Sequence, residues 1–342
     1  MRSMASIRVI SSIKPIPKAD KIELATVDGW SCVVQKGLYQ EGDTVIYCEP
    51  DSWIPHDIAP FLSNGKQPEV FEGVEGAKLR TLRLKGQLSQ GLILNTNLLD
   101  SIVKISIGDD VSDLLGILKY EEPLSEDLIG VAKGKKPFYI PHSDQDRIQN
   151  IFHTPQYTEN VKNHKWFVTE KLEGCSMYVY SSDEGSGVCS SSIEFAEGDS
   201  MFWQTAEKLN LINKVKEISK TLGHHIVIQG ELIGPKIQKN IYKLNDYNFY
   251  AFSMYDIKKG HYLCPQHTYD LCVKHNIKHV PVESTNLDLF SASLDDILDL
   301  AKDNSKINKH KKREGLIFRS LDGTSSFKVI NNDYLLKESN NG

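Results

Sequence analysis

The chain has 342 residues, of which 40% are hydrophobic and 25% are charged, and its formal net charge at pH 7 is −5. The length predicts two domains, each able to bury a core, and the composition is typical of a soluble globular protein. The negative charge argues against a protein that coats nucleic acid nonspecifically, although basic residues could still line one groove of a nucleic-acid enzyme.

No stretch approaches about 18 uninterrupted apolar residues, and residues 1–12 contain no apolar run typical of a signal peptide. We therefore expect an intracellular, soluble protein with no membrane partner. The six cysteines are scattered along the chain, so reduced thiols are expected rather than a disulfide framework.

Residues 1–115 are predicted to form an all-β domain. Several short strands in a domain of this size favour a small closed β-barrel, for which the OB fold is a common solution. Residues 15–23 and 85–91 resemble the OB module of some tRNA-binding proteins. The short β-prone runs, each bounded by turn-forming residues, include residues 31–35, 44–48, 79–84 and 91–94.

Four basic side chains of this domain form a candidate RNA-binding patch. Lys78 and Arg80 share one face of a predicted strand, while Arg83 and Lys85 share the opposite face. The four line one groove only if a β-bulge near Thr81 shifts the register. RNA binding and an ordinary solvated surface both remain open, although such a barrel is a natural platform for nucleic-acid strands.

A change of composition separates this domain from the rest of the chain. Residues 116–140 are acidic first and then basic, and Pro and Gly interrupt them, which predicts a linker. Residues 141–342 then combine predicted helices and strands in a second domain. The expected fold class is therefore α+β, with an N-terminal OB-type β-barrel followed by a mixed α+β domain.

The elements of the second domain follow from capping signals and apolar spacing. Ser143, followed three residues later by Asp146, predicts the N-cap of a helix that carries Arg147. Apolar residues at helical spacing predict two longer helices, over residues 202–222 and 294–301. The expected strands are residues 166–169, 176–181, 226–229, 249–255, 316–319 and 326–330.

Cys264, His267, Cys272 and His275 have the ligand types of a zinc site. The gap between the two pairs is shorter than usual zinc spacings. Residues 266–275 also carry an apolar side at helical spacing, so a helix with ordinary polar residues is favoured over a metal centre.

Four short runs in the second domain carry acid or base groups in a fixed order. The first contains Lys171, and the others contain Glu231, Glu314 and Lys328. Each run is a weak signal by itself. Together they place one lysine nucleophile, two metal-competent carboxylates and a second cation on separate strands that could converge on one phosphate. This set is typical of covalent nucleotidyl transfer.

The chemistry sets conditions on the pocket around the lysine. A lysine amine attacks phosphorus only when it is unprotonated, and the free amine has a pKa of about 10.4. We therefore expect desolvation and the positive charges of Lys328, Arg147 and a bound cation to lower the pKa of Lys171. Glu231 and Glu314 would hold that divalent cation directly or through water.

The ordered set resembles the ATP-dependent RNA ligases of the covalent nucleotidyltransferase superfamily. The resemblance is greatest to the Deinococcus- and Naegleria-type branch, in which an OB module precedes the nucleotidyltransferase domain, and it spans nearly the whole chain. It implies ATP as cosubstrate and Mg²⁺ or Mn²⁺ as the metal. It also implies the site residues: Lys171 linked to AMP, Glu173 at the ribose, Glu170 and Phe252 at the adenine, Arg147 and Lys328 at the phosphates, and Glu231 and Glu314 at the metal.

Two positions depart from the family pattern. Residues 190–192 are all serine where the family often carries Ser-Arg-Asn, and Ser326 stands where several relatives place a second lysine. Fewer phosphate contacts are therefore expected. Ordinary structural roles remain open for several candidates, namely strand-end carboxylates for Glu231 and Glu314, core packing for Phe252 and a solvated helix position for Arg147.

The resemblance implies an enzyme that transfers AMP to a 5′-phosphate end and joins this end to the 3′-hydroxyl end of RNA. We expect a monomer that seals nicked duplexes with RNA on the 3′-hydroxyl side. Lys311, Lys312 and Arg313 could guide the RNA backbone, although a solvated loop explains that run equally well. The alternatives are a GTP-dependent capping-type guanylyltransferase or a DNA ligase, which place the OB domain after the catalytic one, and a non-catalytic OB-type RNA-binding protein.

Overall fold

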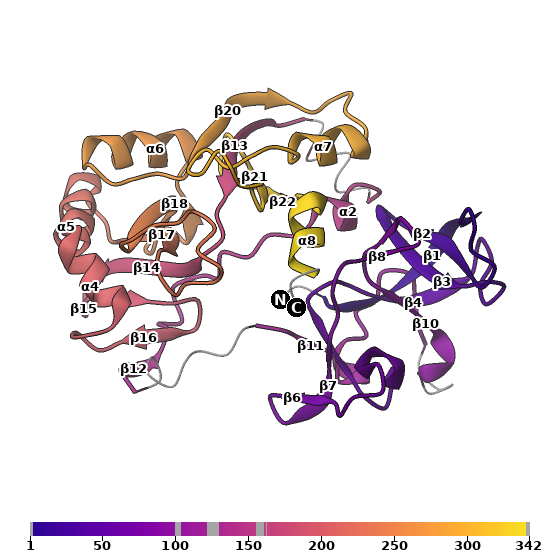
Figure 1. Cartoon of the computed structure of the whole chain (residues 1–342). Helices are drawn as coiled ribbons and strands as arrows, with labels where there is room; N and C mark the ends of the chain where they lie inside the picture. Colours follow the sequence, from indigo (N-terminus) through magenta and orange to yellow (C-terminus); the bar gives the residue numbers. More distant parts are fainter. Residues whose placement is uncertain (1–2, 100–103, 122–129, 155–160, 162, 340–342) are drawn as a thin grey trace. The chain divides into compact units, whose positions relative to one another are not determined.

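The chain divides into two compact units in its computed structural model (Figure 1). One unit contains Met1–Pro123 with Gln149–Thr154 and Leu335–Gly342, and the other contains Leu124–Ile148 with Pro155–Tyr334. The functional division expected at residues 115 and 140 stays a prediction, and residues 122–129 of the expected linker lie outside the described residues. The structure describes residues 3–99, 104–121, 130–154, 161 and 163–339.

The first unit is built mainly from β-strands, as predicted. Its main sheet is antiparallel in the order β10-β4-β1-β2-β3, and the edge strands β10 and β3 contact each other. Fully and partly buried residues alternate along β2 and β3, so one face of the sheet forms the core. The strands are β1 (Ala5–Pro15), β2 (Ile22–Val27), β3 (Trp30–Gln35), β4 (Thr44–Cys48) and β10 (Leu92–Asn95).

A second sheet of this unit, in the order β11-β5-β7-β6, corrects one predicted strand. Residues 79–84 do not form one continuous strand, because β7 ends at Lys78, residues 79–81 are irregular, and a separate hairpin of β8 and β9 begins at Leu82. Lys85 and Gly86 close that hairpin with φ values of 48° and 81°, as in a two-residue turn of type I′. The strands are β5 (Ser52–Pro55), β6 (Glu69–Phe71), β7 (Val74–Lys78), β8 (Leu82–Leu84), β9 (Gln87–Ser89) and β11 (Leu118–Lys119).

The second unit contains two antiparallel sheets. The larger has the order β12-β16-β15-β14-β17-β18-β19, and the smaller has the order β20-β13-β21-β22. All six predicted strands are present. The larger sheet consists of β12 (Ala132–Lys135), β14 (Cys175–Ser182), β15 (Gly185–Cys189), β16 (Ile193–Phe195), β17 (Ile226–Ile233), β18 (Asn248–Asp256) and β19 (His261–Tyr262), and the smaller of β13 (Lys165–Lys171), β20 (Val282–Asp288), β21 (Gly315–Ser320) and β22 (Ser326–Ile330).

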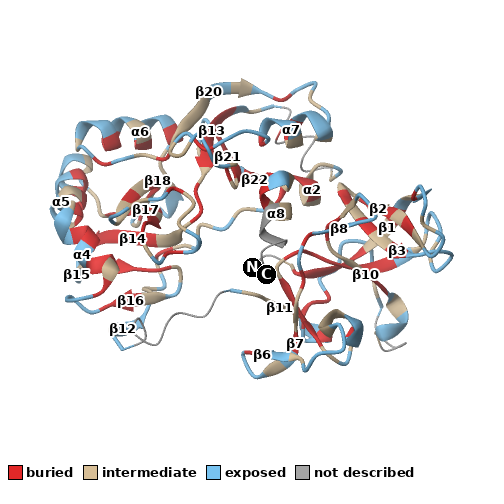
Figure 2. Cartoon of the chain, in the orientation of Figure 1, coloured by how far each residue is buried: buried red, intermediate tan, exposed pale blue. Residues whose placement is uncertain are grey.

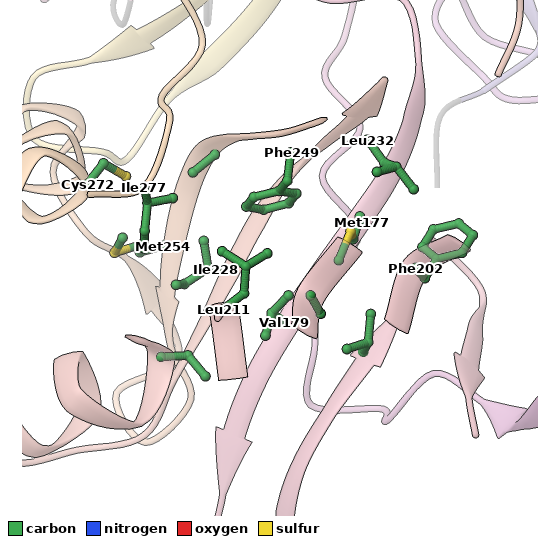
Figure 3. Close-up of a cluster of buried hydrophobic side chains, with 14 of the residues drawn as sticks. Met177, Val179, Phe202, Leu211, Ile228, Leu232, Phe249, Met254, Cys272 and Ile277 are labelled. Atoms are coloured by element: carbon green, nitrogen blue, oxygen red, sulfur yellow. The ribbon is translucent and has the colours of Figure 1, made fainter. Parts of the chain in front are cut away.

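Three helices pack against the larger sheet: α4 (Met201–Lys208), α5 (Leu211–Leu222) and α6 (Pro265–Lys274). Their apolar sides form one core with β14, β17 and β18, and Figure 3 shows Phe202 and Leu211 of the helices beside Met177, Ile228 and Phe249 of the strands. Each large side chain buried there contributes roughly 1.5–3 kcal/mol. The central strands are largely buried (Figure 2), so residues at their ends are held on rigid elements.

The predicted helix at Ser143 is wrong. Residues 143–146 are not helical, α2 (Ile148–Ile151) begins only after Arg147, and Arg147 forms a parallel β-bridge with Lys328. The amide of Lys328 donates to the carbonyl of Asp146 over 2.8 Å. Because the backbone of this segment pairs with β22, its groups are unavailable for a helical turn.

The other predicted helices form with one interruption. The apolar run over residues 202–222 is divided between α4 and α5 at Asn210, whose φ of 55° is incompatible with a continuous right-handed helix. α7 (Leu294–Leu300) begins with a capping box between Ser293 and Asp296, and α8 (Asn332–Ser339) follows β22. Within the described ranges, none of the helices has the length and apolar character needed to span a bilayer.

Candidate active site

The end of β13 and the start of β21 bring the predicted nucleophile and one predicted metal ligand into contact. Lys171 ends β13 and pairs with Gly315, the first residue of β21. Glu314 directly precedes that strand, and Lys171 Nζ donates a hydrogen bond to Glu314 Oε1 over 2.5 Å. The two side chains are 27% and 18% exposed, so a ligand can reach this pair.

Glu231 adds a second carboxylate beside the same lysine. It lies on β17, opposite Ser176 of β14, the strand that follows Lys171 after a short turn. Burial raises the pKa of Glu231 to about 8, although the nearby Lys171 lowers it, and the charge of Glu314 raises it further. Lys171, Glu231 and Glu314 therefore form one electrostatic cluster, as the ordered motifs predicted.

Without a bound cation the pKa of Lys171 is raised rather than lowered, and the depression expected with the cation present stays a prediction. Burial lowers the pKa of Lys171, but the charges of Glu314, Glu231 and Asp144 and the hydrogen bond to Glu314 outweigh burial, so the pKa is raised. The resting amine is therefore held as an ammonium ion.

The two carboxylates fit a divalent cation. Hard cations prefer carboxylate oxygens, and Mg²⁺ is usually held by one or two carboxylates together with waters and substrate phosphates. Here two carboxylates face one lysine, so a cation would neutralise the excess negative charge. In the described parts of the chain, no cluster of three or more His, Cys, Asp or Glu residues could hold a metal. Water and phosphate would complete the coordination of the cation. The interpretation of residues 264–275 as a zinc site gains no support.

Lys328 contacts a carboxylate that sequence reasoning missed. Its Nζ donates to Asp144 Oδ1 over 2.6 Å. The bridge between Arg147 and Lys328 places the predicted phosphate-binding arginine beside this lysine, and Arg147 is only 3% exposed. The two cations thus lie on adjacent backbone segments, and a solvated position for Arg147 is excluded.

Glu173 lies in the turn after Lys171, where its carboxylate already has two donors. Tyr334 donates its hydroxyl to Glu173 Oε2 over 2.6 Å, and the amide of Lys239 donates to Oε1 over 2.9 Å. The amide of Glu173 donates to the hydroxyl of Tyr242 over 2.6 Å. These contacts fix the turn that follows the lysine. A ribose hydroxyl would join or replace one of them.

Glu170 and Phe252, the predicted adenine contacts, differ in their surroundings. Glu170 is 1% exposed, and its Oε2 accepts from the amide of Lys306 over 2.8 Å. Burial raises its pKa. The Phe252 ring is partly buried beside Leu172 and Val280, and the guanidinium carbon of Arg319 lies 5.4 Å from its centroid. The Phe252 ring lines a pocket. The Glu170 carboxylate instead accepts a hydrogen bond from the loop at Lys306.

The glycine after the lysine is required by close packing against β17. A β-carbon at Gly174 would lie 2.5 Å from the carbonyl oxygen of Leu232 and 2.8 Å from Glu231 Cγ. We expect Gly174→Ala to destabilise the protein by on the order of 2 kcal/mol and to displace Glu231. Thermal unfolding and nucleotide labelling of the protein measure both effects.

Gly134→Ala is the matched control, because nothing lies within 4 Å of a β-carbon there. It should unfold and label like the wild type. An unchanged melting temperature and labelling rate in Gly174→Ala would show that β17 does not depend on this contact.

The predicted RNA-binding residues of the first unit are solvent-accessible. Arg80 precedes the β8–β9 hairpin, and Arg83 and Lys85 lie on it, all three exposed. Lys78 lies with its ammonium 4.4 Å from the centroid of the Tyr120 ring. The β-bulge required near Thr81 is not formed, because irregular residues 79–81 separate β7 from β8, so the four residues do not share one strand.

The basic run before Glu314 separates into two kinds of residue. Lys311 is exposed and Lys312 half-buried in a loop. Arg313 is 4% exposed, and its guanidinium binds the carbonyls of Leu300 and Ala301 and the carboxylate of Glu283. Arg313 therefore caps the end of α7, and its guanidinium is engaged in these contacts rather than exposed to an RNA backbone.

Four residues of the site were absent from the predicted set: Asp144, Tyr242, Arg319 and Tyr334. Arg319 follows Glu314 by five residues on β21, so its place on that strand was a usable signal. Tyr242 and Tyr334 contact Glu173 in the turn after Lys171, and Asp144 contacts Lys328 of β22. All three come from segments that are distant in the sequence. No local pattern marks them.

A β-barrel-like unit followed by a two-sheet α+β unit with a lysine and carboxylates at strand ends is the architecture of covalent nucleotidyltransferases. The model of the RNA ligase family matches residues 164–330, and a model of an OB-fold domain matches residues 4–96. No curated protein sequence matches the chain.

Solved structures give a match over the full length. Naegleria gruberi RNA ligase with PPi is 41% identical, with a TM-score of 0.89, and the match covers 99% of this chain and 100% of that one. A mutant of the same ligase with AMP and Mn is 41% identical, with a TM-score of 0.88 and 98% of each chain covered. A second mutant, with ATP and Mn, is 40% identical, with a TM-score of 0.87 and coverage of 97% of this chain and 98% of that chain.

The chain belongs to the RNA ligase family. The predicted fold class, an OB-fold unit followed by an α+β ligase unit, is confirmed, and so is the predicted RNA ligase.

Proposed function

We propose that this RNA ligase uses ATP and a divalent cation to join the 3′-hydroxyl and 5′-phosphate ends of RNA through an adenylate carried on Lys171. The observation that carries the proposal is the cluster of Lys171, Glu231 and Glu314 beside Lys328 and Arg147. Structures of the similar Naegleria gruberi ligase with ATP and Mn and with AMP and Mn support the choice of nucleotide and metal.

In the first step the deprotonated Nζ of Lys171 attacks the α-phosphorus of ATP. The P–N bond forms while the bond from this phosphorus to the bridging oxygen breaks, so pyrophosphate leaves and the amine loses a proton. We assign Lys328 and Arg147, which lie on paired backbone segments, to balance the phosphate charge.

Glu231 and Glu314 would hold the metal, which supplies a positive charge that stabilises the phosphate oxygens. A Glu314 carboxylate engaged by the metal would raise the pKa of Lys171 less than it does in the hydrogen-bonded pair. The same two carboxylates thus hold the resting lysine in place and later free it to react.

Two further transfers complete sealing. An oxygen of the RNA 5′-phosphate attacks the adenylate phosphorus, the P–N bond breaks, and Lys171 recovers its amine. The 3′-hydroxyl then attacks the RNA phosphorus of this adenylated end, which forms the phosphodiester and releases AMP. We propose a nicked duplex with RNA on the 3′-hydroxyl side as substrate, and sealing of nicks with ribose or deoxyribose at that nucleotide tests it.

The exposed cations of the first unit are proposed to bind the RNA backbone. We expect Arg80→Gln, Arg83→Gln and Lys85→Gln, combined, to reduce sealing about 10-fold at physiological salt and to lessen its salt dependence. Labelling of the protein by ATP should remain unchanged, because these residues belong to the first unit and the lysine cluster to the second.

A matched triple variant removes the same charge elsewhere in this unit: Lys14→Gln, Lys36→Gln and Lys66→Gln, all at exposed positions. It should seal like the wild type. Equal losses in both triple variants would point to net charge rather than to a binding patch.

Labelled nucleotides test the reaction itself. With ATP and Mn²⁺ the full-length protein should acquire a covalent label, and with GTP it should not. Labelling by GTP in place of ATP would favour capping-type chemistry, and the absence of any label would contradict covalent nucleotidyl transfer.

A further inference from the structure

A pocket of about 80 Å³ in the second unit lies beside Phe252, the ring proposed to stack on the adenine. Its walls come from five strands and a helix: Gln229 of β17, Phe252 of β18, Tyr262 of β19, Arg319 of β21, Ser326 of β22 and Thr268 of α6. Asp144, the partner of Lys328, also lines it, so the pocket adjoins the proposed phosphate side of the site.

Two buried polar atoms in this pocket have no protein partner among the described residues. They are Gln229 Oε1 and Thr268 Oγ1, on side chains that are 0% and 1% exposed. Gln229 Nε2 donates to the carbonyl of Pro141 over 2.9 Å, which fixes the orientation of the amide. Gln229 Oε1 is therefore an acceptor without a hydrogen-bond donor in the described part of the chain, because the Tyr262 hydroxyl beside this amide donates to the carbonyl of His142 instead. A buried acceptor of this kind is costly unless something binds it.

Arg319 offers the opposite chemistry in the same pocket. It is 9% exposed, and within the described residues no carboxylate lies at ion-pair distance from its guanidinium. Its Nη1 donates only a long hydrogen bond of 3.4 Å, to Thr169 Oγ1, and its carbon lies 5.4 Å from the centroid of the Phe252 ring. Burial lowers its pKa to about 10, so it is still a cation and a pure donor at neutral pH.

One hydrogen-bond acceptor and one donor lie next to an aromatic ring, and together they determine which class of ligand can bind in this pocket. A phosphate group would turn oxygens toward Gln229 Oε1, which can only repel them. Adenine presents an amino donor beside a ring-nitrogen acceptor, whereas guanine presents an oxygen acceptor in place of that amino group. The pocket thus complements the edge of adenine and opposes the edge of guanine.

We propose that Gln229 and Arg319 read the edge of the ATP base, with Gln229 Oε1 accepting from the amino group and Arg319 donating to a ring nitrogen. This inference rests on the proposed function, because it assumes that Phe252 stacks on the base. It assigns selection of ATP over GTP to these two residues.

ATP analogues that lack a single atom of the base test this assignment. The probes are the triphosphates of 1-deazaadenosine, of 7-deazaadenosine and of purine riboside, which lacks the amino group. In the wild type, purine riboside triphosphate and one deaza analogue should form the covalent adduct roughly 10- to 100-fold less efficiently than ATP, in kcat/KM.

In each variant, the difference in kcat/KM between ATP and one of these analogues should disappear. Gln229→Met should label more slowly with ATP but show no further loss with purine riboside triphosphate, and Arg319→Met should behave in the same way toward the sensitive deaza analogue. Arg319→Lys, which keeps the charge, should restore part of the discrimination. A merely structural role would lower labelling with ATP and with every analogue by the same factor.

Gln149→Met is the matched control, because Gln149 is a buried glutamine with an unpartnered oxygen in the first unit. It should leave every ratio between analogues unchanged. If the wild type labels equally well with all three analogues, this inference is overturned while the proposed function stands. If the wild type forms no adduct even with ATP, the proposed function itself fails.

Discussion

Lys171→Ala and Lys171→Met lose the ability to form a covalent adduct with ATP, and their ATP-dependent sealing of RNA falls by at least about 1,000-fold. The reason is chemical, because each substitution removes the amine on which the adenylate is proposed to form. Nucleotide labelling and a sealing assay with 5′-phosphorylated RNA measure the two losses.

The same variants should still seal RNA whose 5′ end is already adenylated, because that step needs only the 3′-hydroxyl attack. Lys165→Met, at the other end of β13 in an exposed ion pair with Asp288, is the control and should retain both activities. Normal sealing from ATP by Lys171→Met would contradict a lysine-linked adenylate.

Glu314→Gln and Glu231→Gln slow adduct formation about 100-fold and increase the concentration of Mn²⁺ required. Each replacement keeps the shape of the side chain but removes a charge proposed to hold the cation. Titration of Mn²⁺ in the labelling assay with ATP measures both effects.

Whether labelling becomes slower or faster in Glu314→Gln distinguishes two roles of Glu314. Its carboxylate also helps to keep the pKa of Lys171 raised, so its removal alone would free the amine and speed attack. Slower labelling therefore identifies the metal role, and faster labelling would contradict it. Asp288→Asn, which removes a carboxylate paired with Lys165, should change neither the rate nor the metal requirement.

The strands of the site could be predicted because each is a short, buried run that ends at a charged residue. Lys171, Glu314 and Glu231 all lie at or near such ends, and the sheet order brings them together. Their order along the chain was sufficient to predict a cluster. The hydrogen bond between Lys171 and Glu314 depends on the register of β13 and β21, which no local pattern contains.

The errors share a physical cause, which is competition from distant backbone. Ser143 has the pattern of an N-cap, but its segment pairs with β22 and so cannot form a helix. Arg313 belongs to a basic run, yet its guanidinium binds the carbonyl groups at the end of α7. Asp144 and Tyr334 enter the site from segments whose sequences carry no catalytic signature.

Peptide mapping by mass spectrometry, after the full-length protein is mixed with ATP and Mn²⁺ and kept near neutral pH, locates the transferred nucleotide. We predict the mass of one adenylate on the peptide that contains Lys171, and its disappearance when RNA with a 5′-phosphate is added. An adenylate on any other side chain, or RNA sealing without any modified peptide, would contradict the mechanism.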